Sequence, residues 1–223
     1  MTTVFLHAFP LDERMWDGFD GFAPRLYGLG ESMDEWAEGI ASDTVLQGED
    51  LAVVGASMGG YCALRLPAHA DVRALVLVGA RAGADPPERR EARDETIRLI
   101  REEGLERLWE VQRPALFPED ADPHVVERAR ALVLEQDPEQ LATGVAAMRD
   151  RPDSTAVLRE TDARVLVARG EHDPFLSAEE AAEMAASARN GRSTHTFAGC
   201  GHLPSLEQPE ELRGVLEEFL AVV

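Results

Sequence analysis

Short apolar runs that end in turn residues recur along the chain and predict its strands. The runs are mostly continuous aliphatic or β-branched stretches, which is typical of strands buried on both faces of a parallel sheet. They comprise residues 3–6, 51–55, 74–78, 165–168 and 194–197.

Helical patterns lie between these runs, and this alternation is typical of βαβ units. Ser32 and Glu35 have the spacing of a capping box and predict the start of a helix. Residues 177–180 repeat that spacing ahead of an alanine-rich stretch. Residues 209–223 carry apolar positions on one helical face and predict a closing helix. The fold class is therefore α/β, with a mostly parallel sheet flanked by helices.

One long region departs from the alternation. Residues 85–160 show helical periodicity interrupted by prolines, with dense charge and no convincing strand. We interpret them as a helical insertion between two strands of the sheet. The predicted core domain consists of residues 1–84 and 161–223.

The net charge of the chain limits the classes of molecule that it is expected to bind. A formal net charge of −20 disfavours nucleic acids and anionic membranes, because their phosphates would be repelled by most of the surface. All 22 basic residues are arginine, so Schiff-base lysines, pyridoxal-phosphate anchoring and the P-loop lysine are excluded. The remaining expectation is a small-molecule substrate.

The N-terminus and the cysteine content indicate a cytoplasmic location. No basic segment followed by a long apolar run opens the chain, and no stretch is long enough to span a bilayer. Only two cysteines occur, as expected in a reducing compartment. We expect Cys62 in the core and Cys200 partly exposed, without a disulfide.

A G-x-S-x-G motif follows the second apolar run. Gly55-Ala-Ser57-Met-Gly59 comes after Leu-Ala-Val-Val and precedes an apolar helical stretch. This context suits a serine on a sharp strand-to-helix turn, with its hydroxyl exposed above the sheet edge. We predict Ser57 as a nucleophile.

A serine hydroxyl needs a base to take its proton. Among six histidines, His202 lies in a loop just after the last predicted strand, where the chain order Ser…Asp…His places the base. His195 lies within a strand and His7 lies in the loop after the first strand. We interpret these two as structural residues.

The orienting acid is expected after a strand end between the serine and the histidine. Asp173 follows the fourth apolar run and is our choice. Glu171 is a near alternative, because spacing alone does not separate the two. Asp85, after the third run, is a further alternative that we rank lower.

Two backbone N–H groups are predicted to form an oxyanion hole. One belongs to Met58, at the start of the helix after the nucleophile, and the other to Phe9, in the loop after the first strand. No histidine–carboxylate cluster has the spacing of metal ligands, so we expect neither a metal nor another cofactor.

Together these segments resemble the α/β-hydrolase superfamily, in particular its small esterase, 3-oxoadipate enol-lactonase-like and cofactor-free haloperoxidase-like members. The matching segments are 7–10, 55–60, 170–174 and 201–204. The resemblance implies that residues 85–160 form a helical cap over the active site. Three cap residues are then candidates to line the substrate pocket, or to pack the cap onto the core: Trp109, Phe117 and Met148.

The front of the chain is short for this superfamily. The first strand leads straight to the oxyanion loop, and residues 16–22 leave no room for the helix that normally follows. We therefore expect a reduced sheet of about six strands, with a homo-oligomer as one way to cover the thinner flank.

The leading functional hypothesis is hydrolysis of an ester, thioester or lactone through an acyl-Ser57 intermediate. Serine in this position also supports C–C hydrolysis, lyase chemistry and perhydrolysis. A non-enzymatic ligand sensor on an intact hydrolase scaffold is the alternative from another class. The sequence leaves the acyl and leaving groups open.

Overall fold

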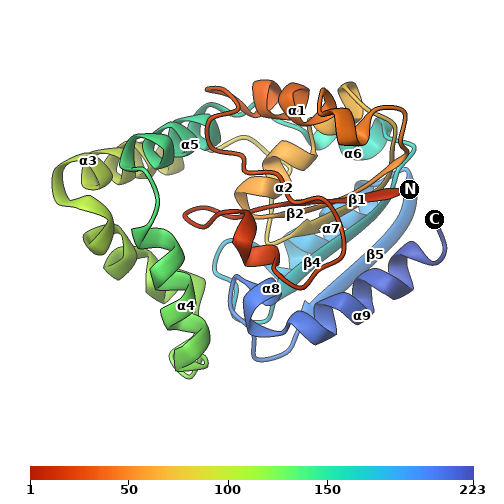
Figure 1. The fold of residues 1–223 in the computed structure, drawn as a ribbon. Helices are drawn as coiled ribbons and strands as arrows, with labels where there is room; N and C mark the ends of the chain where they lie inside the picture. Colours follow the sequence, from red (N-terminus) through yellow and green to blue (C-terminus); the bar gives the residue numbers. More distant parts are fainter.

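A single parallel sheet of five strands forms the centre of the molecule. The computed structural model describes residues 1–223, apart from the side chains of residues 191 and 192. The strands lie in sequence order across the sheet, and every neighbouring pair is parallel (Figure 1). They are β1 (Thr2–Leu6), β2 (Leu51–Ala56), β3 (Val72–Val78), β4 (Arg164–Gly170) and β5 (Asn190–Phe197).

The buried strands confirm what the apolar runs predict. Every residue of β2 is buried, and the interior of the sheet is aliphatic. Such continuous runs are stable between two helical layers, because both faces of the strand are then removed from water.

The sheet has five strands, not the expected six or so. Outside β1, where a sixth strand would pair, only Phe22 forms a parallel bridge, to Val4. The N–H of Phe22 donates to Thr3 O at 2.8 Å and its carbonyl accepts from Phe5 N at 2.8 Å. Pro24 follows two residues later and cannot donate a ladder hydrogen bond, so the pairing ends there.

Helices cover both faces of the sheet (Figure 1). On one face α2 packs on β1 to β3, α1 packs on α2, and α7 packs on β4 and β5. The predicted caps are confirmed: Ser32 accepts from Glu35 N, and Ser177 and Glu180 form a complete capping box. The opposite face carries α8, α9 and the short helix η1. The bounds are α1 (Met33–Ala41), α2 (Met58–Ala63), α7 (Ala178–Ser187), α8 (Pro204–Glu207), α9 (Pro209–Leu220), η1 (Glu13–Trp16), η2 (Thr44–Leu46) and η3 (Leu66–Ala68).

Between β3 and β4 the chain forms helices only, over residues that are all described. Three of them, α3 (Pro87–Leu116), α4 (Pro123–Leu134) and α5 (Pro138–Asp150), pack together beyond one end of the sheet (Figure 1). The long α3 is kinked at Gly104, whose φ of 81° interrupts the helical backbone. The fourth, α6 (Thr155–Glu160), packs against α7 beside the sheet.

Across the described part of the chain, none of the helices combines the length and apolar composition needed to cross a membrane.

Candidate active site

Ser57 occupies a strained turn between β2 and α2. Its backbone has φ 48° and ψ −110°, and it is the one non-glycine residue with positive φ among those that the structure describes. Its N–H donates to Val78 O on the neighbouring strand at 2.8 Å. Such strain persists only where the surroundings enforce it, and this turn raises a serine above the sheet edge.

The glycine after the nucleophile allows α2 to approach the sheet. A Cβ on Gly59 would lie 2.2 Å from Leu6 O, closer than any real contact. The helix therefore starts directly above the end of β1. As a result, the turn bearing Ser57 lies beside the loop that follows β1.

His202 and Asp173 form a buried pair at the same end of the sheet. Nδ1 of His202 lies 2.9 Å from Asp173 Oδ2, and both side chains are almost fully inaccessible to water. The other carboxylate oxygen of Asp173 accepts from Phe175 N at 2.8 Å. The Phe175 ring also packs edge-on against the imidazole, at 4.6 Å between centroids. These contacts fix the ring orientation and leave Nε2 of His202 without a contact to Asp173.

The two alternative acids, Glu171 and Asp85, bind other groups and not His202. Glu171 accepts a hydrogen bond from Gly199 N at 2.8 Å, so its carboxylate is used in holding the loop after β5. Asp85 is fully buried in ion pairs with Arg93 at 3.1 Å and Arg151 at 2.8 Å. Neither of them is hydrogen-bonded to His202.

Two charged residues support the loops that carry the pair. Arg169, buried at the end of β4, donates to the carbonyls of Leu176 at 2.7 Å and Glu171 at 2.9 Å. Glu207 accepts from the backbone N–H of Gly201 and Leu203 on either side of His202. The Glu207 carboxylate thereby fixes the backbone of the loop that carries His202.

The long helix α3 also contacts the histidine loop. Leu116 is its last residue, and its carbonyl accepts from the N–H of His202 at 2.9 Å. The helical segment between β3 and β4 is thus joined by a hydrogen bond to the backbone of the proposed base.

The N–H groups of Phe9 and Met58 are available as donors. Met58 is the first residue of α2, so its N–H has no acceptor within the helix. The N–H of Phe9 has no protein acceptor among the described residues, whereas the preceding N–H, of Ala8, donates to Met15 Sδ at 3.1 Å. The loop is therefore held at Ala8 and leaves the next donor unused.

His7 holds this loop, in agreement with the structural role expected for it. Its Nε2 accepts from Leu26 N at 3.0 Å, and its Nδ1 lies 3.3 Å from Ala8 O. Burial lowers the pKa of His7 to about 4, so the ring is neutral near pH 7.

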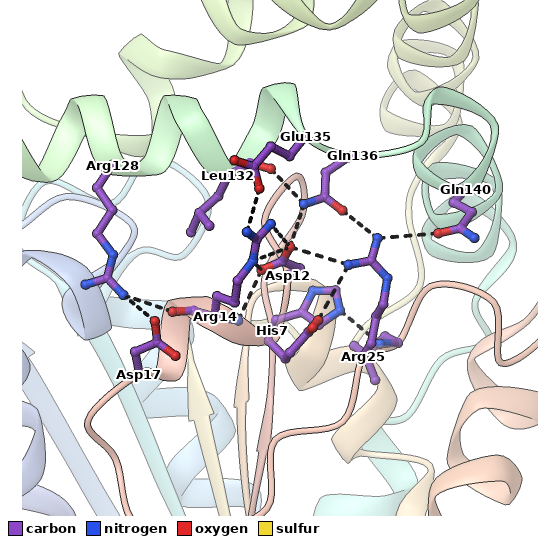
Figure 2. A network of polar contacts seen from close by, with 12 residues as sticks. His7, Asp12, Arg14, Asp17, Arg25, Arg128, Leu132, Glu135, Gln136 and Gln140 are labelled. Carbon is purple, nitrogen blue, oxygen red and sulfur yellow. Dashed lines mark hydrogen bonds and ion pairs between the residues drawn. The ribbon is translucent and has the colours of Figure 1, made fainter.

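A buried carboxylate connects the same loop to the helical segment (Figure 2). Asp12 accepts from the Arg14 guanidinium at 2.7 Å and from the side-chain amide of Gln136, just before α5, at 2.7 Å. Arg25 donates to Gln136 at 2.8 Å, and Arg14 pairs with Glu135 at 2.5 Å. Burial opposes ionisation of Asp12, but these hydrogen bonds outweigh it and keep its pKa below the ordinary value.

A cavity of about 220 Å³ contains Ser57 and His202. Phe9 also lines it, together with residues of α2, α3 and α5, so the cavity lies between the sheet edge and the helical segment. Of the three pocket candidates, Met148 lines this cavity. Trp109 and Phe117 do not: they are buried against each other, with ring centroids 6.3 Å apart.

Comparison with known proteins identifies the family. The sequence pattern of the Alpha/beta hydrolase family matches residues 3–215. The chain belongs to this family. An esterase from Thermogutta terrifontis, solved with malate bound, is 30% identical to this α/β hydrolase, with a TM-score of 0.90 over 98% of this chain and 89% of the esterase.

Two more distant structures share the fold alone. MenH from S. aureus is 22% identical to this α/β hydrolase, with a TM-score of 0.86 over 98% of this chain and 92% of that one. The enol-lactonase from Burkholderia xenovorans LB400 is 18% identical, with a TM-score of 0.81 over 99% and 91% of the two chains. No curated protein sequence matches this α/β hydrolase.

Both cysteines of this α/β hydrolase are free and buried, so the expected partial exposure of Cys200 is wrong. Its thiol lies 3.4 Å from Glu207 Oε1, and burial together with that carboxylate raises the pKa of the thiol. No group of three or more His, Cys, Asp or Glu side chains that could hold a metal ion occurs among the described residues.

Several supporting residues of this α/β hydrolase were not predicted from the sequence. Glu207 lies five residues after His202, and Arg169 directly follows the apolar run 165–168 within β4. A charged residue inside a buried strand is a signal that could have identified Arg169, because a buried charge requires partners. Asp12 and Gln136 are 124 residues apart in sequence, and no local pattern connects them.

Proposed function

We propose that this α/β hydrolase cleaves an ester, thioester or lactone of a small molecule through an acyl-Ser57 intermediate. Family membership and the similarity to an esterase support a hydrolase activity. The proposal for a serine mechanism is carried by one arrangement: a serine on a strained turn shares a cavity with a histidine that is bonded to a buried aspartate.

In the first half of the reaction, Ser57 Oγ attacks the substrate carbonyl carbon while His202 Nε2 takes the hydroxyl proton. Asp173 holds the proton of the other ring nitrogen and stabilises the imidazolium that forms. The N–H groups of Phe9 and Met58 donate to the oxyanion of the tetrahedral intermediate, a contribution of about 3–4 kcal/mol for each donor. His202 then protonates the departing alcohol, thiol or ring oxygen, and the acyl group remains on Ser57.

In the second half, water attacks the acyl-Ser57 carbonyl and His202 takes its proton. The tetrahedral intermediate collapses, the proton returns to Ser57 Oγ and the carboxylic acid leaves. The same histidine thus serves as base and acid in each half.

We propose that α3 to α5 act as a cap over this site and restrict it to small substrates. The cavity of about 220 Å³ is smaller than the ~300–1,000 Å³ of pockets for drug-sized ligands. Short acyl chains are therefore the expected substrates, and a series of p-nitrophenyl esters of increasing chain length would measure the limit.

The nucleophile is tested by Ser57→Ala with Ser42→Ala as its control. Ser42 is exposed at the end of α1, so its change should leave the activity intact. We expect Ser57→Ala to lower kcat for p-nitrophenyl acetate by about 10³-fold or more, and to abolish labelling by a fluorophosphonate. Labelling that persists in Ser57→Ala would refute the serine mechanism.

The choice of acid is tested by comparing Asp173→Asn with Glu171→Gln. Loss of the Asp173 charge should lower kcat by about 10⁴-fold, because an amide does not stabilise the correct tautomer and the imidazolium. Glu171→Gln keeps an acceptor for Gly199 N and should lower kcat far less. The opposite order of effects would assign the acid to Glu171.

A further inference from the structure

Arg89 lines the cavity that contains Ser57 and His202, and its guanidinium has no ion-pair partner among the described residues. It lies in the first turn of α3 and is partly buried. In the described part of the chain the guanidinium also has no hydrogen-bond acceptor, although the backbone N–H of Arg89 donates to Pro86 O at 3.0 Å. Its neighbours do have partners: Arg81 pairs with Glu180, and Arg93 pairs with Asp85 at 3.1 Å.

The position of Arg89 is electrostatically unfavourable in the unliganded protein. Burial and the nearby charge of Arg81 lower the pKa of Arg89 below its ordinary value. The partial positive charge at a helix N-terminus also disfavours a cation in the first turn. An arginine nevertheless stays protonated, because its pKa in water is far above neutrality. The charge of Asp85 favours the cation but does not outweigh these costs, and no described protein group forms an ion pair with the guanidinium.

The surroundings of the cavity carry a local excess of positive charge. Arg81, Arg89, Arg93 and Arg151 are grouped around two carboxylates, those of Asp85 and Glu180. With the Asp173 carboxylate beside His202, these groups make four positive and three negative charges, an excess of one in a chain whose net charge is −20. An anion is therefore repelled by most of the surface but attracted to this cavity.

We propose that Arg89 binds a carboxylate of the substrate, so that the ester cleaved at Ser57 belongs to a small acid-bearing molecule. The planar guanidinium matches a carboxylate in a bidentate pair. A cavity of about 220 Å³ has to hold both the scissile group and the anion, which favours the compact carboxylate. The side-chain amide of Gln112 also lines the cavity and can donate to the same group, whereas the Thr96 hydroxyl already donates to Ala92 O at 2.9 Å. This inference rests on the proposed ester hydrolysis at Ser57.

The test compares esters that differ only in the acid group. On the acyl side, mono-p-nitrophenyl glutarate is paired with p-nitrophenyl valerate. On the alcohol side, 4-acetoxybenzoate is paired with phenyl acetate. In the wild type, kcat/KM should favour the acid-bearing ester in at least one pair. Arg89→Gln should reduce that preference by about 10- to 100-fold, and Arg89→Lys should retain part of it.

Arg98→Gln is the matched control. Arg98 lies on the same helix, is two-thirds exposed and lies outside this cavity, so its change should leave both ratios as in the wild type. A wild type without preference for either acid-bearing ester, or a preference that survives in Arg89→Gln, would overturn the inference.

A binding measurement separates this inference from the proposed function. If the wild type hydrolyses none of the four esters, the serine-hydrolase proposal fails, and calorimetric titration with glutarate then tests Arg89 by itself. Glutarate binding that is lost in Arg89→Gln and kept in Arg98→Gln supports the carboxylate site. Equal binding, or none, in wild type and Arg89→Gln contradicts it.

Discussion

His7 and His202 are both buried, yet their surroundings give the two rings different properties. A backbone N–H only donates, so the contact from Leu26 requires an unprotonated Nε2 on His7 and places its proton on Nδ1, toward Ala8 O. His202 instead directs Nδ1 to the Asp173 carboxylate and lines the cavity. One ring is thus held neutral as part of a loop, and the other faces the cavity that contains Ser57.

The lowered pKa of His7 predicts a loss of stability in acid. The unfolded chain binds a proton at His7 below about pH 6.5, but the folded chain does so only below about pH 4. The stabilising contribution is therefore complete above pH 6.5 and is lost as the pH falls to 4. The loss amounts to about 3 kcal/mol of unfolding free energy.

Urea unfolding of wild type and His7→Gln between pH 7 and 4 measures this loss. The glutamine does not titrate, so the wild-type curve should fall more steeply than that of the variant over this window. Parallel curves would show that His7 titrates normally in the folded protein.

At the scale of elements, the site depends on how closely α2 lies against the sheet. Gly59→Ala would place a methyl group 2.2 Å from Leu6 O and push the helix away from β1. We expect it to lower the unfolding free energy by at least about 2 kcal/mol, because neither backbone segment has room to move. Activity should fall with it, since the turn at Ser57 shifts relative to the loop of Phe9.

Gly214→Ala is the matched control for that change. Gly214 lies within α9, and a Cβ there meets no atom within 4 Å. Alanine should raise the unfolding free energy by about 0.5–1 kcal/mol, because it favours the helix. If both alanine variants proved equally stable in thermal denaturation, close packing at Gly59 would not be required.

At the scale of the whole molecule, the helical segment and the loop after β1 are joined through Asp12 and Gln136. Gln136→Leu removes a donor to the buried carboxylate and an acceptor for Arg25. We expect a loss of about 1–3 kcal/mol of unfolding free energy. We also expect a lower kcat, of the order of 10-fold, because the loop carrying the Phe9 donor is held less firmly.

Gln140→Leu tests whether this effect depends on the buried position. Gln140 is exposed and contacts Arg25 only at 3.5 Å, so its loss should leave stability and kcat nearly unchanged. Urea unfolding and p-nitrophenyl acetate kinetics on both variants distinguish the two positions. Equal effects would contradict a specific role for the contact between Asp12 and Gln136.

Strands and helix starts were predictable from the sequence, because neighbouring residues along the chain determine them. Apolar runs gave the five strands to within a few residues, and side-chain capping gave the starts of α1 and α7. The sixth strand that we expected is reduced to a single bridge between Phe22 and Val4. This was harder to predict, since a bridge and a full strand differ only in the number of residues that pair with β1. The two buried aromatics of α3 and its C-terminus, Trp109 and Phe117, could not be distinguished from pocket residues by spacing.

By itself, the sequence determined the nucleophile candidate and its turn, because the order strand, glycine-flanked serine, helix is a contiguous pattern. Two further predictions come from composition: the lack of lysine predicts no chemistry at a lysine amine, and the net charge of −20 predicts no nucleic-acid partner. Only the tertiary structure decided that Asp173, and not Glu171, is hydrogen-bonded to His202. It also decided that Arg89 lines the cavity with no side-chain partner in the described part of the chain. The physical reason is that hydrogen bonding and charge compensation depend on groups brought together from distant elements, and spacing along the chain does not specify those contacts.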